Sequence, residues 1–120
     1  MGIYKLTEAE NRFAEIIWGN APLSSSDLVK LCEHTLDWKK STTYTVLKKL
    51  CEKRLFCNDN ATVNVLVTRA QYAAQRSHVF VEDSFGGSLP SFFAAFVSGK
   101  QLSEAEAAEI KRLIDEHVEG

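Results

Sequence analysis

The sequence predicts a mainly α-helical fold of the α+β class, built from three short helices, a small hairpin and three further helices. Apolar residues recur at helical spacing up to residue 55, alternate between residues 55 and 67, and return to helical spacing after residue 68. The chain has 120 residues, of which 45% are hydrophobic and 25% charged. A chain of this size and composition suits one domain, or one domain with a small appendage.

The first helix is predicted from a capping box. Thr7 can accept a hydrogen bond from the backbone three residues on, and Glu10 can reach back to the Thr7 backbone. Phe13, Ile16 and Ile17 follow at helical spacing, and the helix should end near residues 19–20.

Two more short helices are expected before residue 55. Ser24, with Asp27 three residues later, opens the second helix, whose apolar face is Leu28, Leu31 and Cys32. The third begins around residues 39–41. Its inward face is predicted to carry Thr43, Val46, Leu47, Leu50 and Cys51.

A two-stranded hairpin is expected next, because residues 58–60 have turn chemistry and Val63, Val65 and Val67 alternate. A hairpin is marginal alone, and the three helices offer it a packing surface. Three helices followed by a hairpin form a winged helix-turn-helix, in which the third helix lies in a DNA major groove. We assign this predicted domain to residues 1–68.

Residues 69–120 are predicted to form a helical dimerisation region. Thr68 and Gln71 form a cap pair, Gly86 and Gly87 break the helix that follows, and Ser103 with Glu106 opens the last helix. The helix expected between them carries an apolar stripe formed by Leu89, Phe92, Phe93, Phe96 and Val97. Three short helices cannot cover this stripe, so a second subunit is expected, although packing on the chain's own first domain is the alternative. The expected interface residues are Tyr72, Phe80, Leu89, Phe92, Phe93, Phe96, Val97, Ile110, Leu113 and Ile114.

Positive charge is concentrated on the third helix. The chain has a net charge of −2, yet residues 37–54 hold six Lys/Arg against two Asp/Glu, a balance of +4. Such a concentration is an electrostatic footprint for a polyanion, or else an ordinary solvated helix face.

The outward face of the third helix favours DNA. Short hydroxyls come first and lysines follow one to two turns later. Threonine offers a hydroxyl to base edges and a methyl group to thymine, while lysines neutralise phosphates. The expected DNA-binding residues are Lys39, Lys40, Ser41, Thr42, Tyr44, Thr45, Lys48, Lys49 and Arg54.

The chain resembles a known family across residues 5–117. The segments that carry the likeness are LTEAE, the short helix after PLS, DWKKSTTYTVLKKLCEKRL, VTRAQY, FGGSLPSFFAAFV and LSEAEAAEIKRLIDE. Together they are similar to the BlaI/MecI/CopY penicillinase-repressor family. The resemblance implies a homodimeric bacterial repressor that binds an inverted-repeat operator through Lys40, Thr42, Tyr44, Thr45 and Lys49. It also implies a further partner, a sensor or protease that acts on the repressor, as in the drug-responsive members of the family.

Four features of the sequence depart from the family pattern. Arg54 stands where the family has a glycine after the third helix, so that helix end should be satisfied differently. The hairpin carries one charged residue, Asp59, where the family's is basic, which leaves Lys53 and Arg54 as the substitutes. The bond matching the protease site is Ala95–Phe96, without the family's asparagine. Because residues 115–120 read DEHVEG, we do not expect the Cys-rich tail of the copper-responsive members.

Other chemistries receive no support from the sequence. Cys32, Cys51 and Cys57 occupy apolar positions typical of buried thiols, although sensor or metal roles are the alternative. The three histidines are dispersed, Ser24–Ser26 suits a helix cap rather than a nucleophile, and no cofactor motif or membrane-spanning segment occurs.

We therefore expect a cytoplasmic, dimeric DNA-binding repressor that is not an enzyme. The alternative is a winged-helix protein-interaction module that has lost operator binding.

Overall fold

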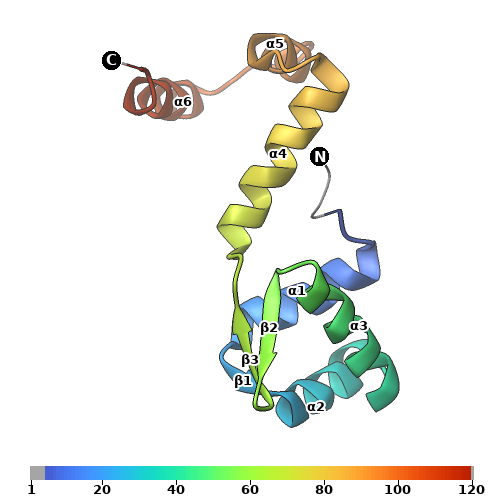
Figure 1. The fold of residues 1–120 in the computed structure, drawn as a ribbon. Coiled ribbons are helices and arrows are strands. Elements are labelled where there is room, and N and C mark those ends of the chain that lie inside the picture. The colour runs from blue at the N-terminus through green and yellow to red at the C-terminus, as the bar shows by residue number, and fades with distance from the viewer. Residues whose placement is uncertain (1–4, 120) are drawn as a thin grey trace. The chain divides into compact units, whose positions relative to one another are not determined.

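The structure, a computed structural model, describes residues 5–119 and divides into two compact units. The first unit ends at Phe80 and the second begins at Val81. The elements are α1 (Glu8–Asn20), β1 (Leu23–Ser24), α2 (Ser25–Leu36), α3 (Lys40–Glu52), β2 (Phe56–Asp59), β3 (Thr62–Val65), α4 (Arg69–Phe85), α5 (Leu89–Val97) and α6 (Glu104–Glu116) (Figure 1). Six helices and one small antiparallel sheet in the described residues confirm the predicted α+β class.

The helix starts follow the predicted caps. The Thr7 hydroxyl accepts from the Glu10 amide at 3.1 Å, and Glu10 Oε1 accepts from the Thr7 amide at 2.9 Å. The Ser24 hydroxyl accepts from the Asp27 amide at 3.0 Å. These bonds satisfy backbone donors that have no partner inside the helix, and they confirm the predicted starts of α1 and α2.

The sheet has one strand more than the predicted hairpin. β1 pairs antiparallel with β3, with Leu23 opposite Val63 and Ser24 opposite Thr62, and the strand order is β1-β3-β2. The predicted hairpin is confirmed as β2 and β3, whereas β1 was not predicted, because a two-residue strand shows no alternation from which it could be recognised. The β2–β3 turn holds Asn60 at φ 51° and Ala61 at φ 61°, the pair of positive φ values that a two-residue hairpin turn requires.

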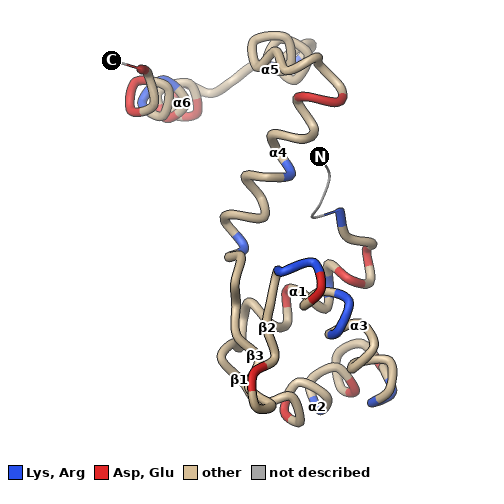
Figure 2. The backbone as a smooth tube through the Cα atoms, in the orientation of Figure 1, with Lys and Arg blue, Asp and Glu red and all other residues tan. Residues whose placement is uncertain are grey.

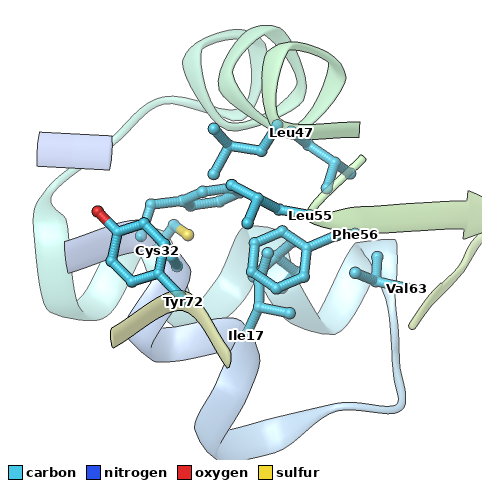
Figure 3. Packing of buried hydrophobic residues seen from close by; sticks show 11 residues of the cluster. Ile17, Cys32, Leu47, Leu55, Phe56, Val63 and Tyr72 are labelled. Atoms are coloured by element: carbon cyan, nitrogen blue, oxygen red, sulfur yellow. The ribbon is translucent and has the colours of Figure 1, made fainter. Parts of the chain in front are cut away.

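A single hydrophobic core supports the first unit. Side chains from α1, α2, α3 and the sheet point toward one another in Figure 3, where Ile17, Leu47 and Phe56 are among those labelled. The first part of α4 joins this core, since Tyr72 is 9% exposed and its ring centroid lies 5.4 Å from that of Trp18. The Trp18 indole donates to the Val67 carbonyl at 2.9 Å, which ties α1 to the segment before α4.

This packing explains why the first unit extends to Phe80, beyond the predicted boundary at residue 68. Helical periodicity predicts that Tyr72 lies on an apolar helix face. It does not show whether that face packs on the first unit or on a second subunit. The functional division between residues 1–68 and 69–120 stays a prediction.

The second unit has no comparable core. Its helices end and begin as predicted: α4 stops at Phe85 before Gly86 and Gly87, and the Ser103 hydroxyl accepts from the Glu106 amide at 3.0 Å. Yet no described residue from 81 to 119 is buried.

Candidate nucleic-acid interface

The two faces of α3 separate as the sequence predicts. Thr43, Leu47 and Leu50 are buried, with exposed fractions of at most 2%. The exposed residues on or next to α3 are Lys39, Lys40, Ser41, Thr42, Thr45, Lys48, Lys49 and Arg54, and Tyr44 is half-buried. The predicted polar residues therefore share one solvent-facing surface, which we call the α3 face.

The hydroxyl groups along α3 differ in the hydrogen bonds that they make. Thr45 Oγ1 donates to the Ser41 carbonyl at 2.9 Å, so its oxygen keeps acceptor capacity while its proton is used within the helix. The Tyr44 hydroxyl lies 3.3 Å from Ser25 Oγ and connects α3 to the start of α2. Among the described residues, the Thr42 hydroxyl has no hydrogen-bond partner. Of the three threonines in α3, Thr42 therefore has the hydroxyl most available to a ligand.

Lys49 of α3 and Lys53, the residue directly after the helix, lie close to the buried carboxylate of Glu10, which the sequence predicted only as part of a helix cap. Lys49 Nζ lies 3.7 Å from Glu10 Oε2, and Lys53 Nζ lies 3.9 Å from Glu10 Oε1. The Thr7 backbone amide, together with both lysines, lowers the pKa of Glu10 below its usual value, although burial opposes the shift. Predicting this contact would have required knowing how α1 packs against α3, because the residues are far apart in sequence.

The end of α3 corrects one expectation. The Leu55 amide donates to the Leu50 carbonyl at 3.1 Å, and the Arg54 amide donates to the Cys51 carbonyl at 3.0 Å. This is the Schellman arrangement usually completed by glycine, and Arg54 adopts the required left-handed conformation at φ 65°. The helix end is therefore satisfied in the usual way, with a strained arginine in the glycine position.

The hairpin adds little charge beside α3. Figure 2 shows Lys and Arg positions on α3 and on the turn that follows it, whereas the β2–β3 hairpin carries only the acidic Asp59. The hairpin turn is attached to α2, since the Ser25 amide donates to the Ala61 carbonyl at 2.9 Å. Any hairpin contact to a polyanion must therefore rely on polar and backbone groups.

Apolar side chains of the second unit are open to solvent. Leu89 is 63% exposed, Phe96 57% and Ile114 56%, and α5 contains no buried residue. The ring centroids of Phe92 and Phe96 lie 5.9 Å apart, so these two side chains of the stripe are neighbours on α5. Of the predicted interface residues, Tyr72 alone is in the first unit's core. The Ala95–Phe96 bond is in α5, with both residues exposed.

Comparisons with known proteins match almost the whole chain. The family model for penicillinase repressors matches residues 6–116. The chain is 26% identical to the penicillinase repressor of Bacillus licheniformis, covering 96% of this chain and 93% of that protein. It is 24% identical to the methicillin resistance regulatory protein MecI of Staphylococcus aureus, covering 93% and 94% of the two chains, and 23% identical to MecI of Mammaliicoccus sciuri at the same coverage.

The chain belongs to the penicillinase repressor family. As a member of this family of DNA-binding regulators it is a transcriptional repressor with DNA as its partner, and it is not an enzyme. The match also confirms the resemblance identified from the sequence motifs.

Within residues 5–119, the cysteines and histidines of this penicillinase repressor family member do not form a metal-binding cluster of three or more side chains. Cys32 is fully buried, Cys51 and Cys57 are half-buried, and burial raises the pKa of the Cys32 and Cys51 thiols. Within residues 5–119, no three His, Cys, Asp or Glu side chains lie close enough to hold a metal ion. No helix in that range is long and apolar enough to cross a membrane.

Proposed function

We propose that the protein is a homodimeric repressor that binds an inverted-repeat operator by inserting α3 into the major groove. The observation that carries this proposal is the α3 face, on which threonine hydroxyls and lysines are exposed while the opposite side is held in the core. A helix whose polar face is open to solvent, and whose other face is fixed by packing, can enter a groove without rearrangement.

The residues of the α3 face take different roles in this proposal. Thr42 and Thr45 meet base edges, because a threonine can offer both a hydroxyl oxygen and a methyl group there. Lys48, together with Lys39, Lys40 and Arg54, binds phosphates, because exposed cations contribute affinity that does not depend on base sequence. Tyr44 and Ser41 contact the sugar–phosphate backbone of the DNA.

Dimerisation through the second unit follows from its exposed apolar stripe. Leu89, Phe93 and Phe96 are 63%, 40% and 57% exposed, which is unusual for large apolar side chains grouped on one short helix. A twofold dimer would cover the stripe with its own copy. Two α3 helices related by that axis would match the two halves of an inverted repeat. The proposed interface comprises Phe80, the last residue of the first unit, and from the second unit Leu89, Phe92, Phe93, Phe96, Val97, Ile110, Leu113 and Ile114. A sensor or protease acting on the repressor would meet the exposed Ala95–Phe96 bond within α5.

The test compares a base-reading residue with a phosphate-binding residue. An operator would first be selected from a random duplex library, and binding of Thr42→Ala and Lys48→Gln to it and to unrelated DNA would then be titrated. Thr42→Ala should cost about 1–3 kcal/mol on the operator and little on unrelated DNA. Lys48→Gln should weaken both duplexes. Equal losses on both duplexes for Thr42→Ala would contradict the assignment of this residue to base reading.

The β2–β3 hairpin, whose only charged residue is the acidic Asp59, favours a second candidate, a winged-helix module that binds a protein instead of an operator. A mobility shift on unrelated DNA at low and moderate salt distinguishes the two. The repressor should bind at low salt and release as salt rises, whereas the interaction module should fail to shift DNA at either concentration.

A further inference from the structure

Glu10 has a more restrained carboxylate than a surface cap requires. Its side chain is 9% exposed, and Oε1 accepts from the Thr7 amide at 2.9 Å. The Thr7 hydroxyl in turn accepts from the Glu10 amide at 3.1 Å, so both ends of the residue are held by the first turn of α1. The position of the negative charge is therefore set by α1 and does not depend on α3.

Lys49 in α3 and Lys53, the C-cap residue of that helix, both approach this carboxylate. They are four residues apart, and Lys53 keeps a right-handed helical backbone conformation, so both side chains leave the same side of the helix end. Their Nζ atoms lie 3.7 Å and 3.9 Å from the two Glu10 oxygens, and Lys53 Nζ also donates to the Lys5 carbonyl at 3.2 Å. Lys53 is one-third exposed, whereas the Lys49 side chain is 63% exposed and can be reached from solvent.

We infer that Glu10 is a positioning residue for the DNA-binding face of α3, which withholds Lys49 and Lys53 from phosphates and fixes the orientation of α3 relative to α1. This inference rests on the proposed function, because it takes α3 as the element that meets DNA. Lys48 and Lys49 are neighbours in sequence, but only Lys49 has an acidic partner within 4 Å among the described residues. The two lysines therefore contribute unequally to DNA binding.

The salt dependence of binding makes this inequality measurable. Each phosphate that a protein cation neutralises contributes about −0.9 to the slope of log K against log salt concentration. A lysine that is already paired with a carboxylate of the protein neutralises less phosphate charge, so fewer counterions are released when DNA binds. Replacing that lysine therefore changes the slope less. A purely structural role for Glu10 would alter stability without producing this pattern.

The experiment uses the full chain and one random-sequence duplex, titrated at several salt concentrations. The variants are Glu10→Gln, Lys48→Gln, Lys49→Gln, the double variant Glu10→Gln/Lys49→Gln, and Glu15→Gln as a control. Gln at position 10 keeps an oxygen that can accept from Thr7 and removes the charge. Glu15 is on the same helix and pairs with Arg69 at 2.6 Å, so its replacement removes an equal charge without touching α3.

We expect Lys48→Gln to reduce the slope by about 0.9 and Lys49→Gln by less than half of that. Glu10→Gln should steepen the slope, Glu15→Gln should not, and Lys49→Gln should recover its full effect of about 0.9 in the Glu10→Gln background. On a selected operator, Glu10→Gln should also lower the ratio of operator to random-sequence affinity, because α3 is less firmly oriented.

Equal slope changes for Lys48→Gln and Lys49→Gln in the otherwise unchanged protein would overturn the inference and leave the proposed function intact. This comparison does not depend on whether Glu10→Gln folds. The inference also fails if Glu10→Gln folds and matches Glu15→Gln. If neither lysine alters the slope, α3 does not meet DNA and the proposed function itself is wrong.

Discussion

The two units of this chain bury their apolar residues very differently. In the first, α1, α2, α3, the sheet and the start of α4 enclose residues such as Phe13, Ile17 and Phe56 with no exposed surface. In the second, α5 and α6 contain no buried residue, although α5 is the most apolar segment of the chain. Apolar content therefore does not decide burial; the number of elements that can surround a residue does.

This difference implies different sources of stability. The first unit has the enclosed core that lets a small domain fold by itself. The second unit has helices with good caps and exposed apolar faces, and caps contribute only about 1 kcal/mol each. We therefore expect the first unit's stability to be independent of protein concentration and the second unit's structure to depend on a partner copy.

The largest effect should come from a charge in the exposed stripe. Phe96→Asp places a carboxylate in the proposed apolar interface, and an unpaired buried charge is costly. The variant should be monomeric with an intact winged helix, and its operator affinity should fall on the order of 100-fold or more, because the second half-site is no longer tethered. Sedimentation and a binding titration measure both quantities. Phe96→Leu, which stays apolar, should remain dimeric. A dimeric Phe96→Asp protein would rule out this stripe as the interface.

A matched pair of truncations sharpens the comparison between the units. Leu47 is 2% exposed and Leu89 is 63% exposed, so the same change to alanine removes a core residue in one unit and a solvent-facing one in the other. Leu47→Ala should cost about 2–5 kcal/mol of unfolding free energy at any protein concentration. Leu89→Ala should lower the melting temperature only where the protein is dimeric. Melting curves at several concentrations would show a concentration-dependent effect for Leu47→Ala if the first unit were not self-sufficient.

Many features of both units were predictable from the sequence, and the features that were not predicted have a common cause. Capping residues such as Thr7 and Ser24, and the two faces of α3, depend on local spacing, and the structure agrees with them. The strand β1, the packing of Tyr72 on Trp18, and the second role of Glu10 depend on contacts between distant segments. Periodicity shows which side of a helix is apolar, but it does not show which surface that side will meet.

Strained backbone positions offer a smaller effect within the first unit. Arg54 and Ala61 adopt φ values of 65° and 61°, which cost a residue with a side chain about 1–2 kcal/mol relative to glycine. Replacing either with glycine should therefore stabilise the protein by about 1 kcal/mol in chemical denaturation, independently of concentration. Arg54→Gly should also weaken DNA binding and reduce its salt slope, whereas Ala61→Gly should leave both unchanged. A stabilised Arg54→Gly protein with full DNA affinity would exclude this arginine from the interface.

The smallest effect concerns one acidic residue in each unit. The pKa of Glu10 is lowered by the Thr7 backbone and then by its two lysines, and the pKa of Glu109 is lowered by Arg112 on the same helix. A carboxyl whose pKa is lower in the folded protein stabilises it above the unfolded pKa, and that contribution disappears as the pH falls through the folded value. Glu10→Gln should therefore destabilise the protein at pH 7 by about 1 kcal/mol or less, and the difference from the unchanged protein should vanish below the usual carboxyl range. Glu109 is fully exposed and its ion pair is screened by water, so Glu109→Gln should have a smaller effect that added salt removes. Urea denaturation of both variants between neutral and acidic pH measures the two differences. If the Glu109 change proved the larger, the buried position of Glu10 would not be what strengthens its interactions.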